Sequence, residues 1–280
     1  IGGPASIYVT PKDLTDLKQI LCYSNKYSIP THFIGSGSNL LVSDDGIDGI
    51  VLSPGKALRK IKFNDCNVFA ESGVMLGKLV RGSIKRNLSG LESLIGVPGT
   101  LGGALVMNAG AFGGEISNYL KNVNIMNMKG DIISYNPNDI KFSYRFSSFK
   151  NTEFIISANF ILKKENAKII LEKRDNANKG RKTNQPLKYR SAGSVFKNPK
   201  NYAAGYLIDQ VGLKGTKIGD AEISNHHANF FINHGNARAL DIAKLIKISR
   251  KKVYEKFGIM LELEIKTIGF KKKELFPYAN

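Results

Sequence analysis

Residues 96–111, with the sequence GVPGTLGGALVMNAGA, constrain the fold more than any other part of this 280-residue chain. Five glycines stand among small apolar side chains, so the segment cannot fill a hydrophobic core of its own. Backbone without bulky side chains can approach a flat ligand closely, and Thr100 and Asn108 would supply polar groups. A tightly packed joint between a loop and a helix would have the same composition, so this segment alone leaves both interpretations open.

A second glycine-rich stretch, GSGSNL at residues 35–40, follows an expected apolar strand at 31–34. Glycines at such a turn let backbone N–H groups point toward an anion, which suits a pyrophosphate. The stretch is neither a Rossmann fingerprint, because the third glycine is missing and LLVSDD continues as extended chain, nor a P-loop, because no Gly-Lys-Ser/Thr ends it. A plain turn between strands is an equal alternative, but two glycine-rich segments together favour a cofactor with phosphates and a planar ring system.

Charge and composition limit the partners. Lysine and arginine exceed aspartate and glutamate by 41 − 23 = 18 charges. The basic residues are spread along the chain without aromatic interleaving, so a lysine-rich solvated surface is the first interpretation, phosphorylated ligands the second and nucleic acid the third. No apolar run reaches the roughly 20 residues of a membrane span. With two cysteines far apart, we expect a reduced protein without a disulfide framework.

The start of the chain, IGGPASIYV, has no basic segment followed by an apolar one, so no signal peptide is expected, and the natural N-terminus is expected to lie upstream. The apolar patterns then predict an α+β protein with a domain boundary near residue 165. The expected elements include a helix from Pro11 with Thr10 as its N-cap, a hairpin of 123–128 with 132–135, strands at 152–162 and 261–268, and helices at 167–179 and 239–257.

The four histidines do not predict a metal site. No His-Glu-x-x-His occurs, and the adjacent His226 and His227 would point apart on a strand. We therefore expect no bound metal.

Seven motifs in order make the sequence similar to a known family. They are IGGPA at 1–5, GSGSNLL at 35–41, GVPGTLGGALVMNAGA at 96–111, YRFS at 144–147, SAGSVFKNP at 191–199, AAGYLIDQVGLKG at 203–215 and LELEIKTIG at 261–269. Together they resemble the UDP-N-acetylenolpyruvoylglucosamine reductases, flavoenzymes of peptidoglycan precursor synthesis, over nearly the full chain. The spacing resembles the shorter type of that family.

The resemblance implies an α+β fold: an FAD-binding domain of the vanillyl-alcohol oxidase type at 1–165, in lobes of about 1–55 and 56–165, and a substrate-binding domain at 166–280. It implies FAD, NADPH as co-substrate, a cytoplasmic and monomeric enzyme, and no nucleic-acid or membrane partner. We expect the FAD to be bound noncovalently, because His32 and the two cysteines lie outside the motifs where a covalent link would be expected. The residues expected to hold FAD are Gly35, Ser36, Gly37, Ser38, Asn39, Leu40, Pro98, Gly99, Thr100, Gly102, Gly103, Asn108, Ala109 and Gly110.

The implied reaction reduces the enolpyruvyl ether of a UDP-sugar to a lactyl ether, and three residues match the family's catalytic motif. Arg145 would stabilise the enolate, Ser194 would donate a proton with help from Lys197 and backbone dipoles, and Glu264 would assist the intermediate. Glu262 and Glu264 would share one face of a strand, so spacing does not choose between them and only the motif favours Glu264.

The expected substrate contacts are Lys197, Asn198, Arg174, Arg181, Gln185 and His227. Two other functions stay open at this point. A flavin oxidase of the same fold would use oxygen and another substrate, and a basic nucleic-acid module would be colourless and bind nucleic acid in a salt-sensitive way.

Overall fold

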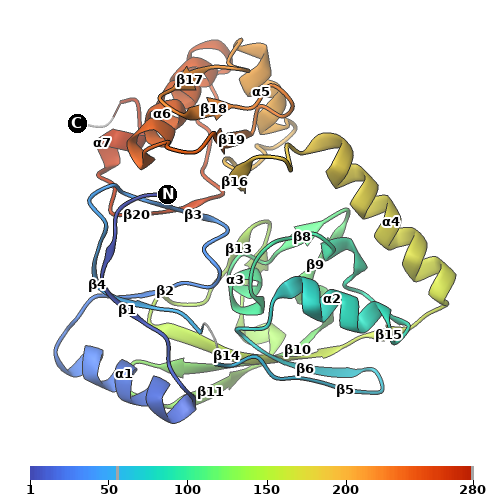
Figure 1. The fold of residues 1–280 in the computed structure, drawn as a ribbon. Helices are drawn as coiled ribbons and strands as arrows, with labels where there is room; N and C mark the ends of the chain where they lie inside the picture. Colours follow the sequence, from blue (N-terminus) through green and yellow to red (C-terminus); the bar gives the residue numbers. More distant parts are fainter. Residues whose placement is uncertain (55–56, 279–280) are drawn as a thin grey trace. The chain divides into compact units, whose positions relative to one another are not determined.

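The computed structural model describes residues 1–54 and 57–278, and the chain forms two compact units (Figure 1). The larger unit contains Ile7–Gly37 and Asp48–Arg181, and the smaller unit contains Ile1–Ser6, Ser38–Ile47 and Lys182–Asn280. The chain therefore crosses between the units at 6/7, 37/38, 47/48 and 181/182. The boundary expected near residue 165 separates an FAD-binding domain from a substrate-binding domain, and it stays a prediction.

A five-stranded antiparallel sheet with the order β11-β10-β14-β6-β5 is the centre of the larger unit. Its strands are β5 (Ile61–Asn64), β6 (Asn67–Glu71), β10 (Leu120–Asn127), β11 (Ile132–Tyr135) and β14 (Glu153–Ile161). A second sheet has the order β1-β4-β2, formed by β1 (Ala5–Val9), β2 (Thr31–Phe33) and β4 (Ile47–Leu52). These two sheets contribute to the hydrophobic cores of the unit.

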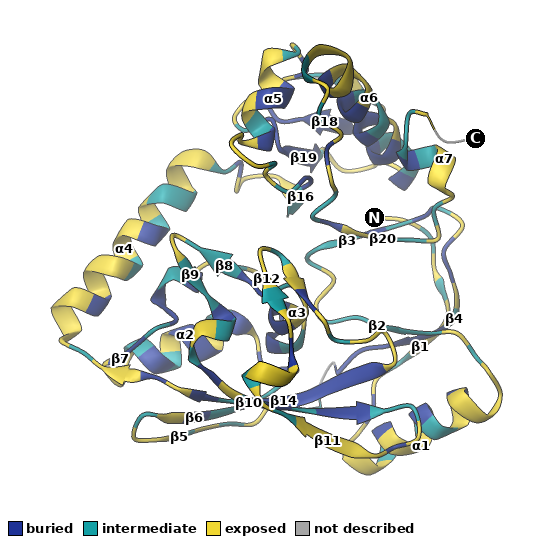
Figure 2. Cartoon of the chain, turned by 180° about the vertical axis from the view of Figure 1, so that it is seen from behind, coloured by how far each residue is buried: buried dark blue, intermediate teal, exposed yellow. Residues whose placement is uncertain are grey.

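Strand β14 is mostly apolar and is buried along most of its length, as its dark blue colour shows in Figure 2. Phe154 and Ile156 pack into a cluster with Leu17 and Leu21 of helix α1 (Leu14–Lys26). Ile155, Ala158 and Phe160 of β14 pack instead into the main core with helix α2 (Leu76–Ile84) and helix α3 (Leu101–Val106). Successive side chains of a strand point to opposite faces, and the irregular register between Ile155 and Ser157 shifts this alternation, so one strand contributes to two cores.

Short elements complete the larger unit. They are β7 (Leu88–Ser89), β8 (Gly110–Ala111), β9 (Gly114–Glu115), β12 (Phe142–Ser143), β13 (Phe146–Ser147), β15 (Lys163–Lys164) and the 3₁₀ turns η1 (Glu92–Leu94), η2 (Ile116–Tyr119) and η3 (Pro137–Asp139). Helix α4 (Ala167–Asn184) is mostly exposed, with only Ile170 and Ala177 buried (Figure 2). It carries the chain out of the larger unit.

The smaller unit contains a four-stranded antiparallel sheet with the order β16-β19-β18-β17 and a parallel pair, β3 with β20. Its elements are β3 (Leu40–Val42), β16 (Arg190–Ser194), α5 (Ala204–Gln210), β17 (Lys217–Ile218), β18 (Ala221–Ile223), β19 (Phe230–Asn233), α6 (Ala239–Phe257), β20 (Lys266–Ile268) and α7 (Lys272–Leu275). The buried stripe of α6 forms the centre of this core.

Arg250 on α6 anchors the C-terminal segment of the smaller unit. It is 2% exposed, its Nε donates to the Leu261 carbonyl at 2.9 Å, and a terminal nitrogen donates to the Leu275 carbonyl at 2.8 Å. Burial lowers the pKa of this guanidinium to about 10. The guanidinium carbon lies 3.9 Å from the centroid of the Phe276 ring. The residues just before Glu264 are therefore fixed from inside the core.

The expected hairpin of β10 and β11 is confirmed, with Val123 opposite Tyr135, and the helix expected at 239–257 is confirmed by α6. The expected start of the first helix is wrong. Asp13, not Thr10, is the N-cap of α1, because the Asp13 carboxylate accepts the Asp16 N–H at 2.9 Å.

The strand expected at 261–268 is also only partly right, because β20 covers Lys266–Ile268 alone. Residues 261–263 lie beside residues 195–197, where Leu263 and Phe196 form an isolated bridge, and the chain bends at 264–265. The expected alternation survives there: Leu261 and Ile265 are buried and Glu262 is exposed.

Candidate active site

The two glycine-rich segments meet in the larger unit. Gly35 lies against the side chain of Thr100, so that a Cβ at residue 35 would collide with Thr100 Oγ1. The Ser53 hydroxyl donates to the Gly35 carbonyl at 3.3 Å. Thr100 is also the N-cap of α3, where its Oγ1 accepts the Gly103 N–H at 3.5 Å. The close approach explains why residue 35 is a glycine.

Backbone hydrogen bonds fix the second glycine segment beside β6 and α2. Gly99 O accepts Leu76 N–H, and Gly102 N–H donates to Ser72 O, both at 2.9 Å. A Cβ at residue 102 would lie 3.1 Å from Ser72 Cβ, which leaves little room. Gly103 in the same helix is exposed, and a Cβ there would meet only Thr100 Oγ1, at 3.7 Å. Gly103 therefore presents bare backbone at the surface of this segment.

Three buried polar atoms in the larger unit have no hydrogen-bond partner within 1–54 and 57–278: Ser72 Oγ, Asn108 Oδ1 and Arg181 Nε. Asn108 is fully buried and is held by its amide nitrogen, which donates to Glu115 Oε2 at 2.7 Å and to the Ser143 carbonyl at 3.1 Å. Unpaired buried polar groups are costly. Together with the exposed glycine backbone, these atoms fit a ligand that carries both donors and acceptors, as FAD does.

Arg145 lies at the tip of the hairpin β12–β13. It adopts a left-handed backbone conformation with φ of +55°, and its guanidinium lies 5.0 Å from the centroid of the Tyr144 ring. The hairpin is tied to the second glycine segment, because the Ser147 hydroxyl donates to the Val106 carbonyl at 2.7 Å and Ser143 O accepts from Asn108. Local geometry thus places Arg145 beside the segment expected to hold the cofactor.

Arg181, near the end of α4, interacts electrostatically with Arg145. Burial lowers the pKa of the Arg181 guanidinium, and the like charge of Arg145 lowers it further. Two guanidinium groups that repel each other and stay close favour an anion between or beside them. Arg174, two turns earlier, is instead paired with Asp175 at 2.7 Å.

Ser194 and Glu264 lie on neighbouring segments of the smaller unit. Ser194 ends β16, opposite Phe230, after an irregular register in which Gly193 has φ of +81°. The Glu264 N–H donates to the Val195 carbonyl at 2.8 Å, so the two residues are adjacent across the two segments. Both are partly exposed. The backbones of SAGSVFKNP and LELEIK therefore lie side by side.

Asn229, which the sequence interpretation missed, holds the Ser194 segment. Its side chain is 2% exposed, its Oδ1 accepts the Phe196 N–H at 2.9 Å, and its Nδ2 donates to the Phe196 carbonyl at 2.8 Å. This pair imitates a strand neighbour and fixes the chain two residues after Ser194. The only sequence signal for this role of Asn229 was its place in the Ala-Asn-Phe stretch that follows His226 and His227.

Asn39 has a similar role for Glu264. Its Nδ2 donates to the Glu264 carbonyl at 3.2 Å, and its own carbonyl accepts the Lys266 N–H at 3.0 Å. The first glycine motif therefore divides: Gly35, Ser36 and Gly37 belong to the larger unit, and Ser38, Asn39 and Leu40 belong to the smaller unit. One part meets the second glycine segment, and the other part meets the segment of Glu264.

Lys197 pairs with Glu262 through a 2.6 Å contact between Nζ and Oε1, and its N–H donates to the Glu262 carbonyl. Glu262 is 72% exposed at its side chain. This pair gives Glu262 a structural partner and directs the Lys197 charge toward it. Asn198 Oδ1 accepts the Ala204 N–H at 3.0 Å at the start of α5, so this expected substrate contact also caps a helix.

The two adjacent histidines lie in the loop between β18 and β19, not on a strand as expected. His227 Nδ1 accepts the Asn229 N–H at 3.1 Å, and burial lowers the pKa of its imidazole. His226 Nε2 contacts the Thr183 carbonyl at 2.8 Å. Within the described part of the chain, no group of three or more His, Cys, Asp or Glu residues could hold a metal ion.

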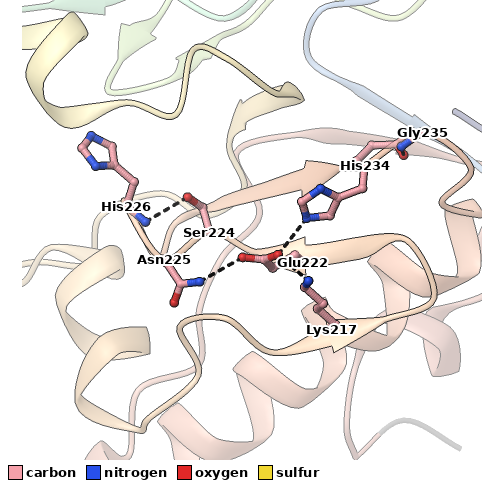
Figure 3. Close-up of polar contacts among 8 residues, drawn as sticks. Lys217, Glu222, Ser224, Asn225, His226, His234 and Gly235 are labelled. Carbon is pink, nitrogen blue, oxygen red and sulfur yellow. Dashed lines mark hydrogen bonds and ion pairs between the residues drawn. The ribbon is translucent and has the colours of Figure 1, made fainter.

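Gln185 lines a groove of about 720 Å³ in the smaller unit, together with Tyr189 and a polar cluster around Glu222. Figure 3 shows this cluster: Glu222 Oε2 contacts His234 Nε2 at 2.7 Å and Lys217 Nζ at 3.4 Å, and its Oε1 accepts from Asn225 Nδ2 at 3.2 Å. The Glu222 side chain is only 7% exposed. One buried carboxylate therefore links β17, β18 and β19 on the groove side of the sheet.

We expect Glu222→Gln to lower the free energy of unfolding by about 2 kcal/mol, because hydrogen bonds to a buried charged group are worth more than neutral ones. Urea unfolding of the flavin-loaded protein measures this. Glu255→Gln, which removes an exposed pair with Lys251, is the control and should change the value by no more than ~0.5 kcal/mol. Equal effects of the two substitutions would contradict a structural role of the Glu222 cluster.

Among the described residues, no helix is both long and apolar enough to span a bilayer.

Comparisons with known proteins agree with this geometry. Residues 5–136 match a family model described as an FAD binding domain, and residues 185–268 match the UDP-N-acetylenolpyruvoylglucosamine reductase C-terminal domain. The chain is 43% identical over 270 residues to the UDP-N-acetylenolpyruvoylglucosamine reductase of Syntrophomonas wolfei, covering 96% of this chain and 90% of that protein. It is 42% identical to the enzyme of the same name from Clostridium novyi, with 96% and 88% coverage.

The chain belongs to the UDP-N-acetylenolpyruvoylglucosamine reductase family. A crystal structure of the UDP-N-acetylenolpyruvylglucosamine reductase from Thermus caldophilus matches with a TM-score of 0.81 at 35% identity, covering 93% of this chain and 91% of that one. The expected fold class, an FAD-binding domain followed by an α+β C-terminal domain, is confirmed. As a member of this reductase family with an FAD-binding domain, the chain is an FAD-dependent oxidoreductase.

Proposed function

We propose that this protein reduces UDP-N-acetylglucosamine enolpyruvate to UDP-N-acetylmuramate, with NADPH as reductant, in peptidoglycan precursor synthesis. Membership of the reductase family supports the reaction class. The observation that carries the proposal is the pairing of the Ser194 and Glu264 segments through the 2.8 Å hydrogen bond from Glu264 N to Val195 O. It puts a hydroxyl and a carboxyl group on adjacent backbone positions of one unit.

FAD held here would supply the hydride chemistry that links NADPH to the enolpyruvyl double bond. The residues proposed to hold it are the two glycine-rich segments, with Gly35 packed on Thr100 and with Ser72 and Asn108 offering buried polar atoms. The ordinary pattern of covalent attachment through His or Cys finds no such residue in these two segments, so we propose noncovalent binding.

Hydride addition leaves negative charge on the substrate carboxylate side and a carbon that needs a proton. Arg145 would stabilise that charge as a permanent cation. Ser194 would donate the proton to that carbon, and Glu264 would assist the intermediate. Because Lys197 is paired with Glu262 at 2.6 Å, the acidity of Ser194 would rest more on backbone dipoles than on Lys197.

Substrate contacts are proposed for Lys197, Asn198, Arg174, Arg181, Gln185 and His227. Arg174 and Lys197 each have an acidic partner, at 2.7 Å and 2.6 Å, so either would exchange that partner for a phosphate. The surplus of 18 positive charges would attract three anionic ligands, FAD, NADPH and the UDP-sugar acid. We propose a monomer that acts in the cytoplasm, where NADPH and nucleotide sugars are available, without nucleic-acid or membrane partners.

The test is turnover. Beyond the single equivalent that reduces its flavin, purified protein should oxidise NADPH only when UDP-N-acetylglucosamine enolpyruvate is present, and the product should be UDP-N-acetylmuramate. UDP-N-acetylglucosamine, which lacks the enolpyruvyl group, is the matched control substrate and should give no turnover. NADPH oxidation that depends on oxygen instead of the enolpyruvyl ether would indicate an oxidase. A colourless protein with salt-sensitive nucleic-acid binding would indicate the other alternative.

Gly103→Ala should fold normally but lose flavin. A methyl group at residue 103 meets only Thr100 Oγ1 at 3.7 Å, an ordinary contact, and alanine favours a helix, so the melting temperature of flavin-free protein should not fall. The cofactor, however, needs bare backbone at this exposed position. Flavin absorbance per protein measures the loss. Gly77→Ala in α2 is the control for a helical glycine and should retain flavin; retention by Gly103→Ala as well would contradict the proposed site.

A further inference from the structure

The hairpin β8–β9 ends in a strained aromatic residue. Phe112 and Gly113 form its two-residue turn, with φ of +50° and +81°. Positive φ at both central residues is typical of a type I′ turn, where Asn-Gly is the favoured pair and a bulky side chain is disfavoured. Phe112 is nevertheless there and is 59% exposed, so hydrophobic burial does not account for it. Strain of this kind often accompanies a functional constraint on the side chain.

The ring of Phe112 packs on the last turns of helix α4. A Cβ at Gly180 would lie 2.8 Å from the ring atom Cε1, so a glycine is required there for the ring to approach the helix. The guanidinium carbon of Arg181 lies 5.8 Å from the ring centroid, within the range of a cation–π interaction. The hairpin tip therefore touches Arg181 directly.

Arg181 is confined from another side by the second glycine segment. A Cβ at Gly96 would lie 3.2 Å from Arg181 Cδ, and Gly96 has φ of +76°. The buried Arg181 Nε has no partner in the described part of the chain. Arg145 is on the β12–β13 hairpin, which the Ser147–Val106 and Asn108–Ser143 hydrogen bonds tie to the same glycine segment, and its charge lowers the Arg181 pKa. The side chain is thus held by packing against Phe112 and Gly96, and an added anion would satisfy its charge.

We propose that Phe112 is a positioning residue that holds Arg181, and that Arg181 and Arg145 together bind one oxyanion group of the substrate. This inference rests on the proposed function. The group is either the carboxylate of the enolpyruvyl ether, where Arg145 is proposed to stabilise the enolate, or the diphosphate of the substrate, in which case Arg145 would not have that role; a pair of guanidinium groups recognises both groups. Phe112 does not touch the reacting atoms in this account; it acts through the orientation of Arg181.

Phe112→Asn creates the favoured Asn-Gly turn and relieves the strain, so it should not lower the melting temperature. If Phe112 only fastened the hairpin to α4, this variant would have the parental KM for the UDP-sugar. If Phe112 positions Arg181, the same variant should still raise KM for the UDP-sugar by about 5-fold, the value expected for loss of one cation–π contact. Phe112→Tyr keeps the ring and should restore the parental KM.

Gly180→Ala provides an independent displacement of the ring. The new methyl group would push Phe112 away from Arg181, while alanine inside a helix keeps or raises the melting temperature. We expect the same rise in KM as for Phe112→Asn, with flavin content unchanged in both variants. Parental KM in Phe112→Asn and in Gly180→Ala would overturn the proposal, and so would a rise that Phe112→Tyr does not rescue.

Inhibition by UDP-N-acetylglucosamine identifies the bound group, because it has the diphosphate but no carboxylate. A raised inhibition constant in both variants assigns the pair to the diphosphate, and an unchanged constant with raised KM assigns it to the carboxylate. Thermal-shift titration with the enolpyruvyl substrate measures binding without turnover. If the parent protein binds this substrate but does not oxidise NADPH, the proposed reaction is refuted and the inference about Phe112 is not. Weaker binding of the substrate by Phe112→Asn than by the parent would then still support the inference, and equal binding would overturn it.

Discussion

Ser194→Ala is expected to remain reducible by NADPH and to lose reoxidation by UDP-N-acetylglucosamine enolpyruvate. The flavin absorbance should bleach with NADPH at the parental rate, because Ser194 has no part in that half-reaction. Its recovery on addition of the sugar substrate should be slower by about 10²–10⁴-fold, the usual contribution of a positioned proton donor. Anaerobic stopped-flow absorbance measures both half-reactions separately.

Ser191→Ala is the matched control for Ser194→Ala. Ser191 is on the same strand, β16, and is exposed, with its Oγ 3.4 Å from the Gly193 N–H. It should have parental rates in both half-reactions. If Ser194→Ala reoxidises with substrate as fast as the parent, Ser194 is not the proton donor.

Glu264→Gln should lower turnover by at least about 100-fold, while Glu262→Gln should lower it by less than about 3-fold. The two carboxylates are two residues apart, and their different environments give the reason. Glu262 is 72% exposed and paired with Lys197, whereas Glu264 is partly buried beside Val195 and Asn39. Steady-state NADPH oxidation at saturating substrate measures both variants, and flavin content checks that each one is loaded.

The pair of substitutions decides a question that the sequence leaves open. A large loss in Glu262→Gln with a parental rate in Glu264→Gln would reverse the assignment of the catalytic carboxylate. Equal large losses would show that both carboxylates are required and that neither alone is the catalytic one.

Elements with strong local patterns were predictable from the sequence. Helix α6 has a long apolar stripe, an Asp241 in its first turn and Gly258 in the left-handed conformation just after its end, so both boundaries are encoded locally. The β10–β11 hairpin has strand-forming segments on either side of a turn with a glycine, Lys129-Gly130-Asp131. Such signals involve neighbours in the chain and need no tertiary contact.

The start of α1 shows where local signals compete. Thr10 and Pro11 form a good start signal, but Asp13 and Asp16 form another one three residues later. Lys12 N–H donates to Asp16 Oδ2 at 2.8 Å while Asp13 accepts from Asp16, and this reciprocal arrangement determines the helix start.

Long-range contacts were beyond prediction from the residues alone. The parallel pairing of β3 with β20 joins residues more than 220 positions apart, and it brings Asn39 to Glu264. Asn229 beside Phe196 and Phe112 beside Arg181 depend on contacts of the same kind. The motifs predicted which residues matter, whereas only the structure shows which side chains hold them in place.

The most direct test of the central claim is reoxidation of the flavin without oxygen. Protein reduced by one equivalent of NADPH under nitrogen should regain its absorbance near 450 nm when UDP-N-acetylglucosamine enolpyruvate is added, with one equivalent of UDP-N-acetylmuramate formed. Reduced protein that stays bleached with this substrate and recovers only in air would contradict the account.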